Sequence, residues 1–135
     1  MAKRIQKFEI PDTSDANHEE YKLGCTAYNN NRYSEAKSHF TNAIEFWPED
    51  YQAWWALGNS YSELGRHSKA EHCYRQALEY NENENEAELL FNLGNSLFDQ
   101  ERYSDAIEIY SKITEQSSTW TKAQKNKDLA LKELR

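Results

Sequence analysis

The chain has 135 residues, with 16 Lys or Arg against 23 Asp or Glu, and a formal net charge of −7. This length fits one domain whose core needs no disulfide staples. The acidic balance excludes nucleic acid as an expected partner, because phosphates would be repelled and the sequence has no basic stripe.

Residues 1–16 precede the repeated part of the chain, and we expect them to form a mobile arm. They contain no continuous apolar stretch of the kind an export signal needs, and Pro11 interrupts any helix. Phe8 and Ile10 are candidates for filling a groove of the same or a neighbouring copy. No apolar run anywhere approaches the roughly 20 residues that cross a bilayer, so we expect no membrane insertion.

From residue 17 onward one pattern occurs three times, in segments 17–50, 51–86 and 87–120. In each copy a leucine is followed by a glycine, and an alanine, an aromatic residue and a second alanine or an isoleucine come 13, 17 and 20 residues after the leucine. Intervals of three and four residues put one apolar stripe on each of two helices per copy. The turns between them read Asn31-Arg32-Tyr33-Ser34, Gly65-Arg66-His67-Ser68 and Glu101-Arg102-Tyr103-Ser104.

A glycine recurs inside the first helix of every copy, as Gly24, Gly58 and Gly94. Glycine inside a helix costs on the order of 1 kcal/mol relative to alanine. Its recurrence predicts that the second helix of each pair approaches closely at this point, where a side chain would block it.

The pattern resembles the tetratricopeptide repeat family, through the motif formed by Trp54, Leu57-Gly58, Tyr61, Ala70 and Tyr74. The resemblance implies an all-α fold, a right-handed α-solenoid of three antiparallel helix pairs plus a capping helix. Residues 121–135 supply that C-terminal capping helix, with alanine and leucine on one face and lysine on the other. Its apolar side is too narrow to favour a membrane-surface helix.

We expect no enzyme, no cofactor and no metal site, because the sequence has no glycine-rich phosphate loop, nucleophile motif or histidine pair at metal spacing. His67, His72 and Cys73 are close in sequence, but adjacent helical residues point about 100 degrees apart. The acidic run 81–86 lacks the glycine of a calcium loop and is interpreted as a solvated connection. Cys25 and Cys73 are interpreted as reduced thiols of a cytoplasmic protein, although spacing leaves one disulfide open.

The family resemblance implies that ligands bind the inner side of the first helices, at five positions of each repeat. The fifth positions form an aromatic series, Tyr21, Trp55 and Phe91, which we expect to be exposed in a groove beside asparagine amides. The alternative is that these rings pack between neighbouring helices. The predicted peptide-binding residues are Tyr21, Cys25, Tyr28, Gln52, Trp55, Asn59, Glu63, Glu88, Phe91, Asn95, Phe98 and Asp99.

Family members that hold acidic chaperone tails use a clamp of lysine, arginine and asparagine. The corresponding positions here are Tyr21, Cys25, Ala56, Glu88 and Asn92, which argues against that ligand. The repeats, residues 17–117, hold 8 basic and 18 acidic residues. We therefore predict a protein-interaction adaptor for a neutral to basic partner protein or peptide with apolar anchors.

The alternative function is a structural self-assembling unit, a homo-oligomer whose ends or convex faces stack through Trp47, Trp120 and the terminal helix.

Overall fold

The computed structural model describes residues 16–82 and 85–135. Residues 1–15 of the expected N-terminal arm therefore lie outside the described residues. The described part forms seven helices and no strand. Their bounds are α1 (Ala16–Asn29), α2 (Tyr33–Phe46), α3 (Tyr51–Glu63), α4 (His67–Tyr80), α5 (Glu86–Asp99), α6 (Tyr103–Tyr110) and α7 (Trp120–Glu133).

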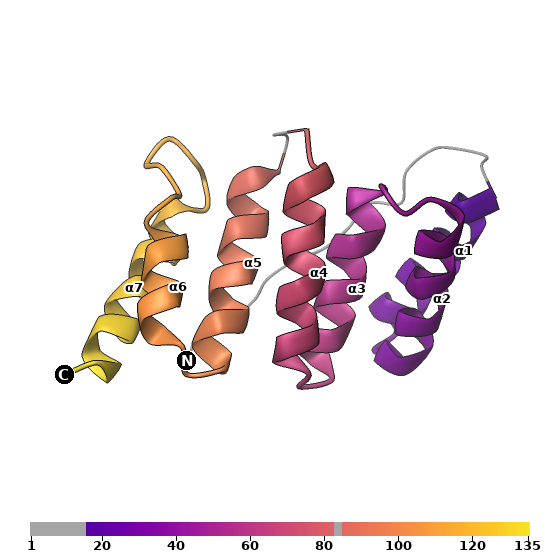
Figure 1. The fold of residues 1–135 in the computed structure, drawn as a ribbon. Coiled ribbons are helices and arrows are strands. Elements are labelled where there is room, and N and C mark those ends of the chain that lie inside the picture. Colours follow the sequence, from indigo (N-terminus) through magenta and orange to yellow (C-terminus); the bar gives the residue numbers. More distant parts are fainter. Residues whose placement is uncertain (1–15, 83–84) are drawn as a thin grey trace.

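The helices form a row in chain order, with α1 and α2 at one end and α7 at the other (Figure 1). Each helix packs on the next, and the first helices also touch in series: α1 with α3, α3 with α5, and α5 with α7. No second helix touches the next second helix among the described residues. The predicted solenoid of helix pairs with a capping helix is thereby confirmed.

The three turns inside the pairs share one backbone geometry. The residue before the arginine has a positive φ in every copy, 63° at Asn31, 78° at Gly65 and 62° at Glu101. The arginine N–H then donates back to a carbonyl five residues earlier, as from Arg66 to Tyr61 at 2.8 Å. This closes the last turn of the first helix and reverses the chain.

Each recurring glycine faces the aromatic ring of its own second helix. A Cβ built on Gly58 would lie 2.7 Å from Cε1 of Tyr74 and 3.2 Å from Cβ of Cys73. Gly24 faces Phe40, and Gly94 faces Tyr110, in the same way. The predicted close approach of the two helices is therefore confirmed, and its cause is the buried ring that occupies the space.

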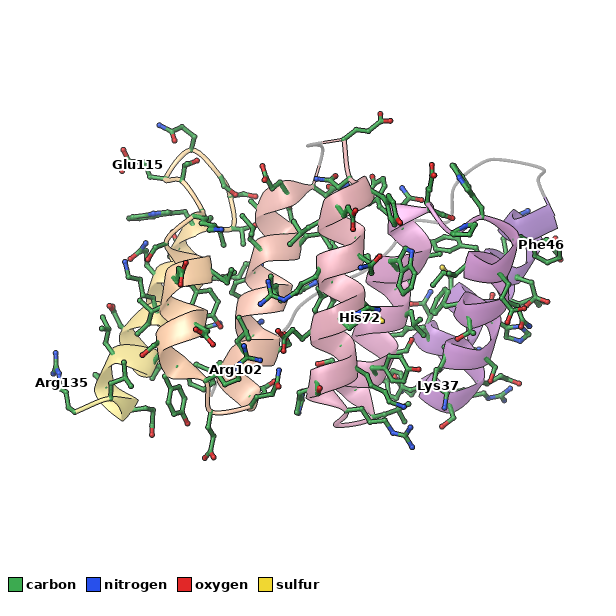
Figure 2. All side chains as sticks on the ribbon, in the orientation of Figure 1. Lys37, Phe46, His72, Arg102, Glu115 and Arg135 are labelled. Atoms are coloured by element: carbon green, nitrogen blue, oxygen red, sulfur yellow. The ribbon has the colours of Figure 1, made fainter. Side chains whose placement is uncertain are left out.

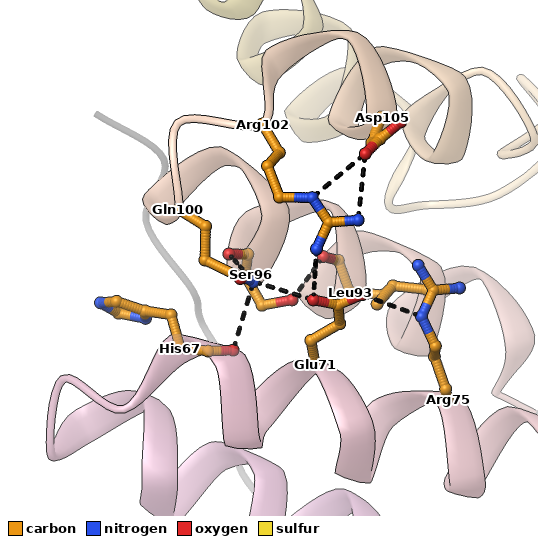
Figure 3. A network of polar contacts seen from close by, with 8 residues as sticks. All are labelled: His67, Glu71, Arg75, Leu93, Ser96, Gln100, Arg102 and Asp105. Carbon is orange, nitrogen blue, oxygen red and sulfur yellow. Dashed lines mark hydrogen bonds and ion pairs between the residues drawn. The ribbon is translucent and has the colours of Figure 1, made fainter.

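A polar network joins the second and third pairs on the side of the second helices (Figure 3). Glu71 of α4 accepts hydrogen bonds from Arg102 at 2.7 Å, from Gln100 at 3.0 Å and from Arg75 at 3.0 Å. Arg102 also donates to Asp105 at 3.1 Å. Burial alone would raise the pKa of Glu71, but the hydrogen bonds from Gln100 and Arg75 and the charge of Arg102 lower it below its usual value.

The capping helix α7 packs on α6 and α5 through Ala123 and Ala130, which are fully buried as predicted. The leucines predicted for the same face, Leu131 and Leu134, are exposed, so that part of the prediction is wrong. Asn126, from the same helix, is also buried. No helix within the described residues combines the length and apolar character that crossing a membrane requires.

Replacing Gly58 by alanine is expected to lower the free energy of unfolding by about 1–2 kcal/mol, although alanine is the better helix former. The new methyl group meets Tyr74, and overpacking outweighs the gain in helix propensity. Urea denaturation measures the change. The matched control is Asn42→Ala, an exposed position of α2, which we expect to be neutral or stabilising. Equal stability of Gly58→Ala and the wild type would contradict the packing argument.

Candidate functional site

The candidate site is the inner face, which we define as the side of α1, α3, α5 and α7 on which consecutive first helices touch one another. The second helices make no such contact with one another among the described residues. Side chains from four helices that are distant in sequence therefore gather on this face, as they do in repeat proteins that bind along a concave surface.

The aromatic series is buried, so the prediction that its rings are exposed is wrong. The exposed fractions are 2% for Tyr21, 5% for Trp55 and 3% for Phe91. Each ring of the series comes three residues, or about one helical turn, before the recurring glycine. Because the aromatic ring of the second helix lies against that glycine, the two rings are close together. The ring centroids are 5.6 Å apart between Tyr21 and Phe40, and 6.2 Å between Phe91 and Tyr110.

The predicted amides are buried as well, in hydrogen bonds within and between pairs. Oδ1 of Asn59 accepts from the hydroxyl of Tyr74 at 2.5 Å within the same pair. The same oxygen accepts from Nδ2 of Asn92, in the next pair, at 3.4 Å. Asn59 and Asn92 thus connect α3, α4 and α5 through one oxygen atom.

The same arrangement recurs one pair later. Oδ1 of Asn95 accepts from the hydroxyl of Tyr110 at 2.6 Å and from Nδ2 of Asn126, on the capping helix, at 3.0 Å. Burial raises the pKa of the Tyr110 hydroxyl above its usual value, so it remains a donor. The Nζ atom of Lys122, on α7, lies over the Phe91 ring, 5.4 Å from the ring centroid. The capping helix thus contacts the last ring of the series.

The first pair has no such bond, because the corresponding residues are Cys25 and Phe40. Both are fully buried, and Ala56 stands where Asn92 and Asn126 stand in the later helices. The tyrosine of the second helix, the asparagine of the first helix and the asparagine of the next first helix thus occur together, as in the second and third pairs, or are all absent, as in the first pair. Asn92 and Asn126 are partners that were not predicted from the sequence, although their joint occurrence with a tyrosine and an asparagine is a signal that indicates them.

Solvent reaches most of the remaining predicted residues. Glu63 is exposed, and Tyr28, Gln52, Glu88 and Asp99 are partly exposed, whereas Phe98 is buried against Tyr103. The Oδ2 atom of Asp99 lies 3.5 Å from Nδ1 of His67. The predicted residues that solvent reaches are therefore mainly carboxylates and an amide, whereas the ring series is buried.

The histidines and the cysteine singled out near the second turn face different surroundings. His67 faces Asp99, His72 packs on the ring of Trp54 at 5.9 Å, and Cys73 is buried. No group of three potential metal ligands occurs among the described residues. Cys25 and Cys73 are both free thiols.

A family model described as tetratricopeptide repeat matches residues 21–69 and 56–119, which together span most of the chain. The chain belongs to the tetratricopeptide repeat family. The repeated helix pairs of the chain are thus those of this family.

Solved tetratricopeptide domains have the same fold at low sequence identity. One is the TPR2B domain of yeast Sti1, in a structure described as its complex with pHsp70. Its sequence identity to this chain is 15% and the TM-score is 0.80, and the match covers 87% of this chain and 97% of that one. The first TPR of Spaghetti (RPAP3), bound to the HSP90 peptide SRMEEVD, is 16% identical with a TM-score of 0.76, over 87% and 94%. The Sgt2 TPR domain from Aspergillus fumigatus is 21% identical with a TM-score of 0.77, over 90% and 82%.

The Tyr74–Asn59 bond is expected to show strong coupling in a double-mutant cycle. Tyr74→Phe should cost about 1–2 kcal/mol, because Asn59 loses its shorter donor inside the core. In an Asn59→Cys background, which copies the first pair, the same change should cost nothing or stabilise. Guanidinium denaturation of the four variants measures the coupling, and an equal cost in both backgrounds would contradict the assignment.

Both thiols are expected to resist modification in the folded protein. Burial raises the pKa of Cys25 to about 11, against an opposing hydrogen bond from Tyr21, and raises that of Cys73 to about 12. At mildly alkaline pH a disulfide reagent that releases a chromophore should react only after guanidinium unfolds the chain. Rapid reaction of two thiols per native chain would show that the core is open at these positions.

Proposed function

We propose that this chain is a protein-interaction adaptor that binds a peptide segment of a partner protein along the inner face. The observation that supports this most is the series of contacts between α1, α3, α5 and α7, which joins four first helices side by side. A surface of that length suits an extended segment or a helix, because either would contact several repeats at once.

The charge of this face favours a neutral to basic partner. Its accessible residues include the carboxylates of Glu63, Glu88 and Asp99, one or two from each inner pair. Lys or Arg side chains of a partner would meet opposite charge there, and the encounter would be faster at low ionic strength. Apolar partner side chains would contact the edges of the floor rings, since Trp55 and Phe98 each retain a small exposed area.

Unpaired buried amides supply a second reason to expect a peptide. The Nδ2 atoms of Asn59 and Asn95 are buried and have no hydrogen-bond acceptor among the described residues. An unsatisfied buried donor costs on the order of 1–3 kcal/mol. Asn59 and Asn95 are enclosed, so a backbone carbonyl of a bound segment would recover part of that energy only where binding displaced the side chains that cover them.

An acidic chaperone tail is not the partner we propose. The positions that hold cations and asparagine in family members with a carboxylate clamp are Tyr21, Cys25, Ala56, Glu88 and Asn92 in this chain. Four of the five are buried, and Glu88 would repel a carboxylate. The complexes of the two neighbours, with pHsp70 and with an HSP90 peptide, support a role in protein interaction for this chain. The residues at its own clamp positions favour a partner of different charge.

We propose no catalytic step, because the described residues of the inner face include no constellation of nucleophile, base and orienting group. The two buried thiols are consistent with a reducing compartment, and we place the protein in the cytoplasm on that basis.

Two heptapeptides test the charge preference of the inner face: SRMEEVD, and the same peptide with lysine in place of its Glu and Asp residues. The lysine peptide is expected to bind at least about tenfold more tightly in fluorescence anisotropy at low salt. Glu63→Lys with Glu88→Lys should remove this preference. The control pair is Glu108→Lys with Glu115→Lys, which makes the same charge change away from the inner face and should preserve it.

Tighter binding of SRMEEVD to the wild type would contradict the charge assignment, and absence of binding by either peptide near millimolar concentration would contradict peptide recognition by this face. Trp55→Ala and Phe91→Ala are unsuitable tests, because truncating these buried rings would destabilise the core by several kcal/mol.

A further inference from the structure

The large apolar side chains that solvent reaches are concentrated near the two ends of the row. Residues 51–82 and 85–130 include the second and third helix pairs. In these described ranges no large hydrophobic side chain is exposed. The exposed ones are Leu23 (43%), Phe46 (64%), Trp47 (49%), Leu131 (39%) and Leu134 (52%). They come from the first pair and the turn after it, or from α7. Exposed apolar area that gathers at specific places on a protein marks interaction sites.

Leu23 occupies a position that is covered in the other pairs. Leu57 is buried in one cluster with Tyr21 and Phe40 of the preceding pair, and Leu93 is buried in one cluster with Tyr74 of its preceding pair. No described helix precedes α1, so the same face of α1 is open. We call the outer side of α1 and α2, with Leu23 and Phe46, the leading face. Phe46 lies at that end of the row, opposite to Arg135 (Figure 2).

The leading face is only partly adapted to water. Glu20 and His39 stand where Trp54 and Cys73 stand in the second pair, and Nδ1 of His39 lies 2.7 Å from Oε2 of Glu20. Terminal repeats normally carry a polar outer face, because no further repeat covers them. Leu23 and Phe46 therefore remain as apolar exceptions beside a polar pair.

At the other end, α7 is a first helix without a second helix among the described residues. Leu131 corresponds to Leu97, which is fully buried, and Asp128 corresponds to Gly94, where the Tyr110 ring approaches. With no ring to accommodate, Asp128 is exposed, and Leu131 and Leu134 face solvent. We call this side of α7, with Leu131 and Leu134, the trailing face.

The two ends carry opposite charge. Residues 16–50 hold six acidic and three basic residues, a net charge of −3, whereas residues 118–135 hold five basic and two acidic residues, a net charge of +3. Two leading ends would repel each other, and so would two trailing ends. A leading end and a trailing end attract each other. The charges therefore favour contact between the leading end of one copy and the trailing end of another over contact between two like ends.

We propose that copies of this chain associate head to tail, with the leading face of one copy on the trailing face of the next. Leu23 and Phe46 would cover Leu131 and Leu134, with the lysines of α7 near the carboxylates of the first pair. Such a contact joins two different surfaces, so it continues into open chains unless rotation closes a ring. It leaves the inner face free, and successive copies would extend it.

Sedimentation velocity of the full chain over a wide concentration range tests the association. The wild type is expected to show a weight-average mass that rises with concentration beyond that of a dimer. Leu23→Gln with Phe46→Gln blocks the leading face, and Leu131→Gln with Leu134→Gln blocks the trailing face. Each blocked variant alone should sediment as a single chain, because its remaining active face has no complement.

An equimolar mixture of the two blocked variants should give a complex of two chains and nothing larger, since each variant retains one active face. This result separates head-to-tail contact from a symmetric dimer, in which one of the variants would still pair with itself. All four positions are exposed, so the fold should persist, and circular dichroism with thermal denaturation checks it.

Charge supplies a matched control. Lys125→Glu with Lys132→Glu on α7 should weaken association at least about tenfold at low salt. Arg66→Glu with Lys69→Glu makes the same charge change on exposed residues of the second pair, away from both ends, and should leave association unchanged. A wild type that remains a single chain at every concentration, or a mixture of blocked variants that does not pair, would overturn the proposal without affecting peptide binding by the inner face.

Discussion

The contact between a glycine of each first helix and an aromatic ring of the second helix is the constraint on which the structure depends. It occurs as Gly58 with Tyr74 and as Gly94 with Tyr110, and it sets how closely the helices of a pair approach. The loss of helix propensity at glycine is offset by burying a whole ring, which contributes more than a methyl group would. Because the contact recurs, each pair presents the same shape to the next, and the pairs stack in a row.

The joining of pair to pair is polar as well as apolar. On the inner side a single amide oxygen, Oδ1 of Asn59, receives a hydroxyl from its own pair and an amide from the next. On the outer side Glu71 receives bonds from Arg102 and Gln100 of the following pair. Directional bonds of this kind fix the angle between pairs more sharply than leucine packing does.

The family and the order of helices could be predicted from spacing, because leucine, glycine and the aromatic residue recur at intervals that one helix pair must satisfy. The turns followed too, since Asn31 and Gly65 tolerate the positive φ that chain reversal needs. The exposure of Tyr21, Trp55 and Phe91 could not be predicted in this way. It depends on how near consecutive first helices lie, which no single helix encodes.

The sequence by itself determined which residues are equivalent and therefore which side of each helix faces its partner, because that information is local and periodic. Only the tertiary structure decided which equivalent residues reach water, since burial at one position depends on the neighbouring pair. Leu23 is exposed where Leu57 and Leu93 are buried for that reason, and Asn59 is enclosed because Tyr74 and Asn92 meet its side chain from two other helices.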